Sequence, residues 1–243
     1  MKQRWIYGFH AVIARLRTAP DSVKELWLDE TRRDTRAKDL LALAASKGVN
    51  ARQTEGHRLD KMVGGARHQG VVAKVETISQ THTLDDVLAR IEGPALIVVL
   101  DGVTDPHNLG AVLRSADAFG AHAVIAPKDK AAGINATVEK VASGAAETIP
   151  YLMVTNLVRS LNELKEHNVW TVAAEAEAQR TIAQIDATVG MAWVLGAEGA
   201  GLRRLTRETC DDAARIPIGG SIESLNVSVS AAICLYETAR QRT

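Results

Sequence analysis

The 243-residue chain is long enough for one large domain or two of moderate size, and its hydrophobic content of 46% is typical of a globular protein. It contains no run of about 18 apolar residues, which argues against a membrane-spanning helix, and residues 1–10 lack the apolar core of a signal peptide. We therefore expect a cytoplasmic protein. Cys210 and Cys234 lie in apolar segments without a C-x-x-C pattern, so we predict buried free thiols and no disulfide or zinc site.

The formal net charge is zero, but the charge is unevenly distributed. Residues 1–74 contain 15 Lys and Arg against 8 Asp and Glu, an excess of 7 positive charges. Residues 75–243 contain 14 against 21, an excess of 7 negative charges. A basic module attracts polyanions such as RNA. Charge alone, however, leaves nucleic-acid binding and an ordinary basic surface as equal alternatives.

Strand-like and helix-like segments alternate along the whole chain, which indicates the α/β class. A polar stretch at 76–93 separates residues 1–75 from residues 94–243, and we interpret it as a linker between two domains. For the first domain we predict strands at 4–8, 23–29, 49–54 and 70–75 and helices at 9–19, 36–48 and 57–65.

The second domain opens with ALIVVL, a continuous apolar run typical of a buried parallel strand. Five more apolar segments with intervening helices predict a doubly wound parallel sheet, in which ligands bind at the carboxyl ends of strands. The predicted strands are 95–100, 122–127, 148–154, 169–174, 192–196 and 214–218, and the helices are 111–120, 136–144, 155–167 and 225–243.

Three polar loops follow strands of the second domain. The first, DGVTDPHNLG, places Asn108 where its amide oxygen would cap the following helix, and Arg114 projects from that helix six residues later. The third, IGGSIESLN, carries Ser224 and Asn226 just before the C-terminal helix. Helix capping alone would explain these last two residues, and an ion pair with Asp117 would explain Arg114.

The second loop, LGAEGAGL, has glycines in the order G-x-x-G-x-G, the reverse of the dinucleotide fingerprint. Glycines allow the backbone to approach a ligand closely, and Glu198 is either a solvated charge or an oriented acceptor. Because loops at the carboxyl ends of parallel strands converge on one pocket, an enzyme is the favoured interpretation. The chain lacks the P-loop, zinc-protease and serine-hydrolase motifs, so the loops by themselves do not define the reaction.

The three loops resemble the three motifs of the SpoU (TrmH) group of SPOUT methyltransferases. The first motif, D-P-x-N-L-G-x-x-x-R-S-A-x-A-F-G, spans 105–120; the second, L-G-x-E-G-x-G-L, spans 195–202; the third, I-P-x-x-G-x-x-x-S-L-N-V-S-V, spans 216–229. The resemblance implies an N-terminal α/β domain of the L30e type that binds RNA. It also implies a C-terminal SPOUT domain, a parallel sheet with a deep trefoil knot.

The same resemblance implies an activity: methylation by S-adenosylmethionine, without a metal, of the ribose 2′-hydroxyl of a specific guanosine in the peptidyl-transferase P loop of 23S rRNA. It further implies a homodimer with each site completed across the interface, and no membrane partner. The implied catalytic residues are Asn108, Arg114, Glu198, Ser224 and Asn226. The implied cofactor-binding residues are Leu195, Gly196, Ala197, Gly201, Ile216, Ile218 and Leu225.

Two questions stay open at this point. Arg114 would act as general base or proton relay, or it would bind an RNA phosphate while a phosphate oxygen or Glu198 takes the proton. The alternative functions are methylation of another rRNA site or of tRNA, and a non-catalytic RNA-binding factor in ribosome assembly. The candidate phosphate contacts, each of which is otherwise a solvated charge, are Arg4, Arg32, Arg33, Arg36, Arg67 and His68.

Overall fold

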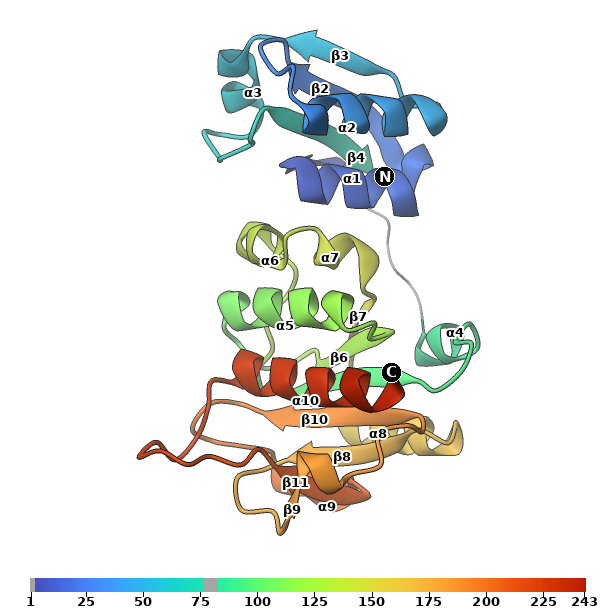
Figure 1. Cartoon of the computed structure of the whole chain (residues 1–243), viewed down its shortest axis with the longest axis vertical. Helices are drawn as coiled ribbons and strands as arrows, with labels where there is room; N and C mark the ends of the chain where they lie inside the picture. Colours follow the sequence, from blue (N-terminus) through green and yellow to red (C-terminus); the bar gives the residue numbers. More distant parts are fainter. Residues whose placement is uncertain (1–2, 77–82) are drawn as a thin grey trace. The chain divides into compact units, whose positions relative to one another are not determined.

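The computed structural model describes residues 3–76 and 83–243. The chain forms two compact units (Figure 1). They consist of residues 1–80 with 143–148, and of residues 81–142 with 149–243.

Part of the predicted linker, residues 77–82, lies outside the described residues. The rest of segment 76–93 contains one short helix, α4 (Leu84–Leu88). Thr83 caps this helix by accepting a hydrogen bond from the amide of Asp86 at 3.1 Å, while the Asp86 carboxylate accepts from the amide of Thr83 at 2.9 Å. Such a capping box satisfies two of the free amides at the start of the helix.

The first unit is a four-stranded sheet with helices. Its elements are β1 (Gln3–Tyr7), α1 (Phe9–Thr18), η1 (Pro20–Ser22), β2 (Val23–Asp29), α2 (Thr35–Ser46), β3 (Ala51–Thr54), α3 (Gly56–Met62), β4 (Val71–Glu76) and, from segment 143–148, α7 (Ala145–Thr148). The strand order is β1-β4-β2-β3, with β4 antiparallel to both neighbours and β3 parallel to β2. Every strand and helix predicted for residues 1–75 is present, with ends that differ by at most three residues.

The core of this unit follows from the sequence pattern. In β2, Val23, Leu26 and Leu28 are buried, and they pack with Leu16 of α1 and Leu40 of α2 in one apolar cluster. The apolar faces of both helices and of the sheet are thus removed from water together, which is the main favourable contribution to folding.

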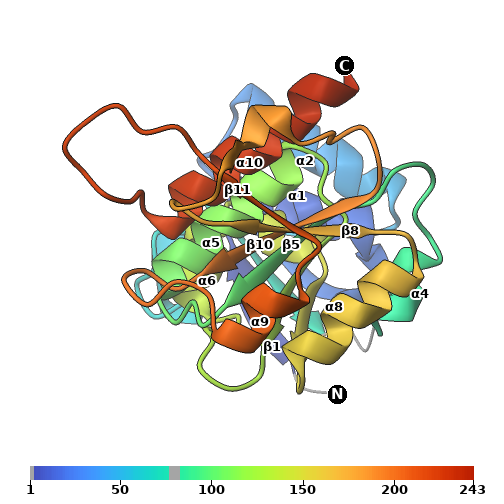
Figure 2. The same ribbon diagram turned by 90° about the horizontal axis from the view of Figure 1, so that it is seen from below.

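The second unit is a seven-stranded sheet in the order β7-β6-β5-β10-β8-β11-β9, and all its strand pairs are parallel (Figures 1 and 2). Its strands are β5 (Leu96–Asp101), β6 (Ala123–Pro127), β7 (Tyr151–Val154), β8 (Trp170–Ala174), β9 (Arg180–Thr181), β10 (Met191–Gly196) and β11 (Asp212–Arg215). Its helices are α4, α5 (Pro106–Ala118), α6 (Ala136–Ala142), α8 (Leu157–Glu166), η2 (Ile182–Gln184), α9 (Arg204–Thr209) and α10 (Val227–Arg242).

Both faces of this sheet are covered by helices, which explains the uninterrupted apolar runs in the sequence. Ile97 and Val194 pack with Leu161 of α8 on one face. On the other face the fully buried Trp193 contacts α10. The predicted parallel α/β sheet is confirmed, and the trefoil knot stays a prediction from the resemblance.

Three details of the predicted sheet were wrong. The strand predicted at 148–154 begins only at Tyr151, because Ala145–Thr148 forms the helix α7. The two-residue strand β9 was missed because it is too short to show a pattern. The last strand was predicted to continue to Ile218 but ends at Arg215. Pro217 has no amide hydrogen to donate to a neighbouring strand, so the chain leaves the sheet before it.

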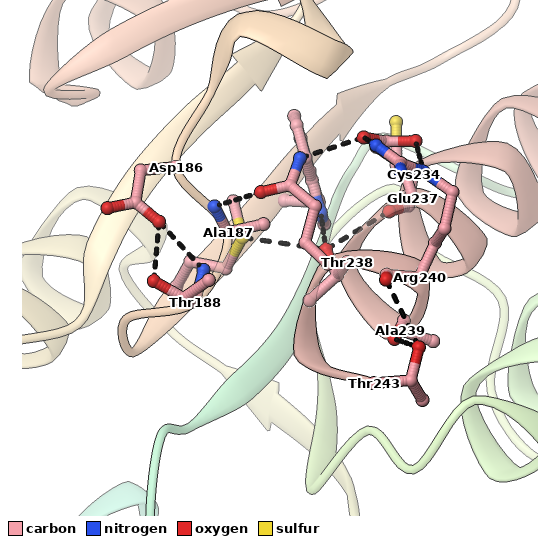
Figure 3. Close-up of polar contacts among 12 residues, drawn as sticks. Asp186, Ala187, Thr188, Cys234, Glu237, Thr238, Ala239, Arg240 and Thr243 are labelled. Carbon is pink, nitrogen blue, oxygen red and sulfur yellow. Dashed lines mark hydrogen bonds and ion pairs between the residues drawn. The ribbon is translucent and has the colours of Figure 1, made fainter.

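The C-terminal helix α10 is fixed to the sheet by buried polar contacts as well as by packing (Figure 3). Trp193 Nε1 donates a hydrogen bond to Thr238 Oγ1 at 2.9 Å, and this hydroxyl donates to the carbonyl of Cys234 at 3.1 Å. Near the end of the helix, the amide of Ala187 donates to Gln241 Oε1 at 2.9 Å. The helix therefore has a defined position relative to β10 along its C-terminal half.

Both cysteines are free: Cys234 is buried, as predicted, whereas Cys210 is only partly buried. Burial raises the pKa of each thiol to about 12. Across the described ranges, no helix combines the length and apolar character that crossing a membrane requires.

Candidate active site

A cavity of about 560 Å³ opens at the carboxyl ends of β8, β10 and β11 and beside the start of α10. Its volume lies in the range of about 300–1,000 Å³ common for small-molecule sites. Two residues predicted to be catalytic, Glu198 and Ser224, line it. So do all those predicted to bind a cofactor, namely Leu195, Gly196, Ala197, Gly201, Ile216, Ile218 and Leu225.

One wall of the cavity is the loop 197–202, called here the glycine loop. Ala197 and Gly201 form an antiparallel bridge, with N–H···O distances of 3.2 and 2.9 Å, so that Glu198 lies at the tip of a tight return. The returning chain passes close to Gly196, where an added Cβ would lie only 2.1 Å from the carbonyl carbon of Gly201. The glycine at 196 is therefore required by the close approach of two backbone segments.

The first motif begins its helix earlier than predicted. Helix α5 starts at Pro106, and Asp105 is its N-cap, accepting a hydrogen bond from the amide of His107 at 2.9 Å. The prediction that Asn108 caps this helix was wrong, because proline is favoured at the first helical position and the aspartate before it takes the capping role. Asn108 lies in the first turn of the helix, and its side chain contacts Asn226 instead.

The structure brings Asn108 and Asn226 together. Asn226 Nδ2 donates to Asn108 Oδ1 at 3.0 Å, so the first and third motifs are joined by a side-chain hydrogen bond. Asn226 also caps α10, since its Oδ1 accepts from the amide of Ser228 at 2.9 Å and from the Ser228 hydroxyl at 2.6 Å. The cap and the contact with Asn108 use different atoms of one amide group, so both roles hold at once.

Ser224 does not cap the C-terminal helix. This helix was predicted to begin at Leu225 but starts at Val227, with Asn226 as the capping residue. Ser224 lies in the preceding loop, exposed and facing the cavity. Its hydroxyl is thus available to a ligand.

Arg114 lies on the exposed side of α5. In the part of the chain that the structure describes, it is not among the residues that line the cavity. Its neighbours Leu113 and Ala116 are buried, so the helix is anchored by one face and presents the guanidinium on the other.

Sequence reasoning missed three charged residues of the cavity, Glu175, Glu177 and Arg207. Glu175 and Glu177 directly follow β8, so the rule that ligands meet the carboxyl ends of strands would have found them. Glu175 accepts a hydrogen bond from Arg207 Nε at 2.7 Å, which raises the pKa of the guanidinium. With Glu198, the lining contains three carboxylates and one guanidinium, an excess of negative charge that favours a ligand carrying positive charge.

The basic residues proposed for RNA contact divide into two groups. Arg32 and His68 are held by other parts of the first unit: Arg32 Nε pairs with Asp34 at 2.6 Å and His68 Nε2 contacts Asp60 at 3.0 Å. Arg4 on β1 belongs to the same group, since it is partly buried and pairs with Glu147 of the same unit at 2.6 Å. The exposed candidates are Arg33, Arg36 and Arg67.

Comparison with known proteins gives two family matches. The SpoU rRNA Methylase family matches residues 95–236, and the RNA 2′-O ribose methyltransferase substrate binding family matches residues 5–81. Within residues 3–76 and 83–243, no group of three or more His, Cys, Asp or Glu side chains is arranged to hold a metal ion.

Individual relatives cover nearly the whole chain. It is 58% identical over 235 residues to the 23S rRNA (guanosine-2′-O-)-methyltransferase RlmB of Bordetella pertussis, a match that covers 97% of this chain and 96% of the relative. The crystal structure of the SpoU methyltransferase AviRb from Streptomyces viridochromogenes in complex with AdoMet matches with a TM-score of 0.79 at 25% identity, over 99% of this chain and 90% of the other. A crystal structure of an RNA 2′-O ribose methyltransferase matches with a TM-score of 0.79 at 28% identity, over 99% and 89%.

Proposed function

Because this chain belongs to the SpoU rRNA Methylase family, we propose that it transfers a methyl group from S-adenosylmethionine to the ribose 2′-hydroxyl of a guanosine in 23S rRNA. The identity of 58% to a relative named for this reaction, over almost the full length of both chains, carries the proposal. A guanosine of the peptidyl-transferase P loop is the target we propose from the resemblance of the motifs.

The cavity fits the expected cofactor. S-adenosylmethionine has a flat aromatic adenine, whose faces pack against apolar side chains, and a positively charged sulfonium, and it supplies an already activated methyl group when bound. The apolar side chains of Leu195, Ile216, Ile218 and Leu225 line the same cavity as the carboxylates described above. The absence of a side chain at Gly196 lets the glycine loop pack against the end of β10, so the backbone of both segments lines the cavity.

We assign the catalytic roles by position. Asn226, fixed by its cap and by Asn108, and Ser224, on the cavity wall, orient the ribose. Glu198 is a carboxylate at the tip of the glycine loop and accepts the proton of the 2′-hydroxyl. A guanidinium keeps its proton at neutral pH, so Arg114 acts as a cation that binds an RNA phosphate.

The proposed division of labour between domains places RNA binding in residues 1–75 and catalysis in residues 94–243, joined by a linker. The two family matches, at 5–81 and 95–236, support it. The basic excess of residues 1–74 supports it independently, because neutralising phosphates contributes much of RNA affinity. Exposed Arg33, Arg36 and Arg67 are the proposed phosphate contacts. A protein that modifies ribosomal RNA is expected in the cytoplasm.

We also propose a homodimer. The segment between β11 and α10 extends away from the sheet and carries Ile222, which is 57% exposed (Figure 2). On α10, Val229 and Tyr236 are 46% and 55% exposed. Large apolar side chains in this number on one helix and its preceding loop are typical of a covered surface. Sedimentation equilibrium of the intact protein would test this, and a monomer at micromolar concentration would contradict it.

The function is tested with methyl-labelled S-adenosylmethionine and undermodified total RNA, followed by separation of 23S rRNA, 16S rRNA and tRNA. We expect label on 23S rRNA alone, and none with Arg114→Ala, whose cofactor affinity should stay within about twofold of wild type. Arg90→Ala, which removes an exposed arginine of the same unit, is the control and should leave the label unchanged.

The other outcomes are also informative. Label on tRNA would support the proposed methyl transfer but contradict 23S rRNA as the substrate. Cofactor binding without methyl transfer to any RNA, including precursor ribosomal particles, would contradict the enzyme and favour an RNA-binding assembly factor.

A further inference from the structure

Asp101 is a buried carboxylate that none of the three motifs includes. It is the last residue of β5, and its side chain has no exposed surface. Its Oδ1 accepts a hydrogen bond from Arg203 Nε at 2.6 Å, and its Oδ2 accepts one from the amide of Arg203 at 3.1 Å. A buried carboxylate is retained only with such compensation, and here both bonds come from one residue.

The two partners join two loops of the site. Asp101 is the first residue of the loop DGVTDPHNLG, which leads into the first motif, and Arg203 immediately follows the glycine loop 197–202. In the sheet, Asp101 is paired in register with Gly196, the residue from which the glycine loop departs. The loop therefore leaves β10 beside Asp101 and is tied back to Asp101 where it ends.

The glycine loop is closed at two levels. The bridge between Ala197 and Gly201 closes its tip, and the contacts of Asp101 with Arg203 close its base. At the base, the amide and the guanidinium of Arg203 both donate hydrogen bonds to Asp101. These two bonds fix the direction of the backbone at residue 203 as well as its position. Arg203 is also the N-cap residue of α9, which begins at Arg204.

We infer that Asp101 is a positioning residue that holds the glycine loop as a wall of the cavity and thereby sets the place of Glu198. The inference rests on the proposed methyltransferase function and extends it to a residue outside the motifs. Among the described residues, Asp101 is not one of those that line the cavity; it acts on the cavity wall through Arg203.

The test compares Asp101→Asn and Arg203→Ala with Arg204→Ala. Asn keeps the size of Asp101 but presents an amide N–H₂ towards one of the two donors of Arg203. Arg203→Ala removes the guanidinium and keeps the buried carboxylate with its backbone bond. Arg204 is the next residue, and within the described part of the chain it pairs with the exposed Glu208 on the same helix, which makes it the matched control.

Four quantities are measured on folded protein: the Kd for S-adenosylmethionine by calorimetry, kcat and KM for RNA, and hydrogen exchange of the amides of Ala197 and Gly201. We expect Asp101→Asn and Arg203→Ala to raise the cofactor Kd about tenfold or more, to lower kcat with an unchanged KM for RNA, and to speed exchange in the loop. Arg204→Ala should match wild type in all four.

Lower thermal stability with unchanged Kd, kcat and loop exchange would mean that the pair only stabilises the fold, and would overturn the inference. If Asp101→Asn does not fold, the same measurements on Arg203→Ala test the inference. If the wild-type protein binds no S-adenosylmethionine, the proposed function fails, and the hydrogen exchange of the loop still decides whether Asp101 holds it.

Discussion

Replacement of Gly196 by alanine is the sharpest test of the cavity geometry. The new Cβ would lie 2.1 Å from the carbonyl carbon of Gly201, 2.4 Å from its oxygen and 2.4 Å from the amide nitrogen of Leu202. Ordinary contact begins at 3.4 Å, so the glycine loop has to retreat by about 1.3 Å. Every atom in the way belongs to the backbone, so no side-chain rotation can relieve the clash.

The retreat has two measurable consequences. Overpacking of this kind costs about 1–3 kcal/mol of stability, which corresponds to a Tm lower by roughly 2–4 °C for each kcal/mol in a chain of this size. Because the glycine loop is a wall of the cavity, a displacement of about 1 Å should also raise the Kd for S-adenosylmethionine at least tenfold and lower kcat further.

Calorimetric titration at a temperature where the variant is folded measures the Kd, and a thermal melt measures the stability. Gly133→Ala is the matched control, because a Cβ there meets nothing within 4 Å and the backbone of Gly133 does not require glycine. A Gly196→Ala protein with the wild-type Kd and Tm would refute the reasoning, since it would mean that the loop does not pass this close to β10 in solution.

Three further predictions follow from the same unit. Thr238→Val leaves the buried Trp193 Nε1 without an acceptor and should lower the free energy of unfolding by about 1–3 kcal/mol in urea titrations, with an unchanged cofactor Kd; a change below 0.5 kcal/mol would contradict this. Asn108→Ala, Asn226→Ala and the double variant should give a coupling energy of about 0.5–1.5 kcal/mol in a double-mutant cycle of transition-state stabilisation, whereas additive effects would show that the hydrogen bond is not used. Burial raises the pKa of Cys234 to about 12, so as pH rises the unfolded chain loses this proton first and the stability contributed by the neutral thiol decreases above about pH 8.5. Urea unfolding at pH 8 and 10 should therefore show a smaller decrease in the free energy of unfolding for Cys234→Ala than for wild type. Equal decreases for the two proteins would contradict the raised pKa.

The sequence by itself determined the class of fold and the three loops of the site. The strands β5, β6 and β10 are continuous apolar runs because both of their faces are covered, and this burial leaves a direct signal in composition. The glycines and polar residues at 105–120, 195–202 and 216–229 stand out because they interrupt such runs at the ends of strands.

Other features were decided only by tertiary structure. Local pattern placed a cap at Asn108, yet the side chain is engaged with Asn226, 118 positions away, and Asp105 is the cap. The roles of Glu175 and Asp101 depend on β8, β10 and β5 being neighbours in the sheet, although they are far apart in the chain. Periodicity reports how much of a segment is buried, whereas a hydrogen-bond partner is chosen by the packing of distant segments, which no local pattern encodes.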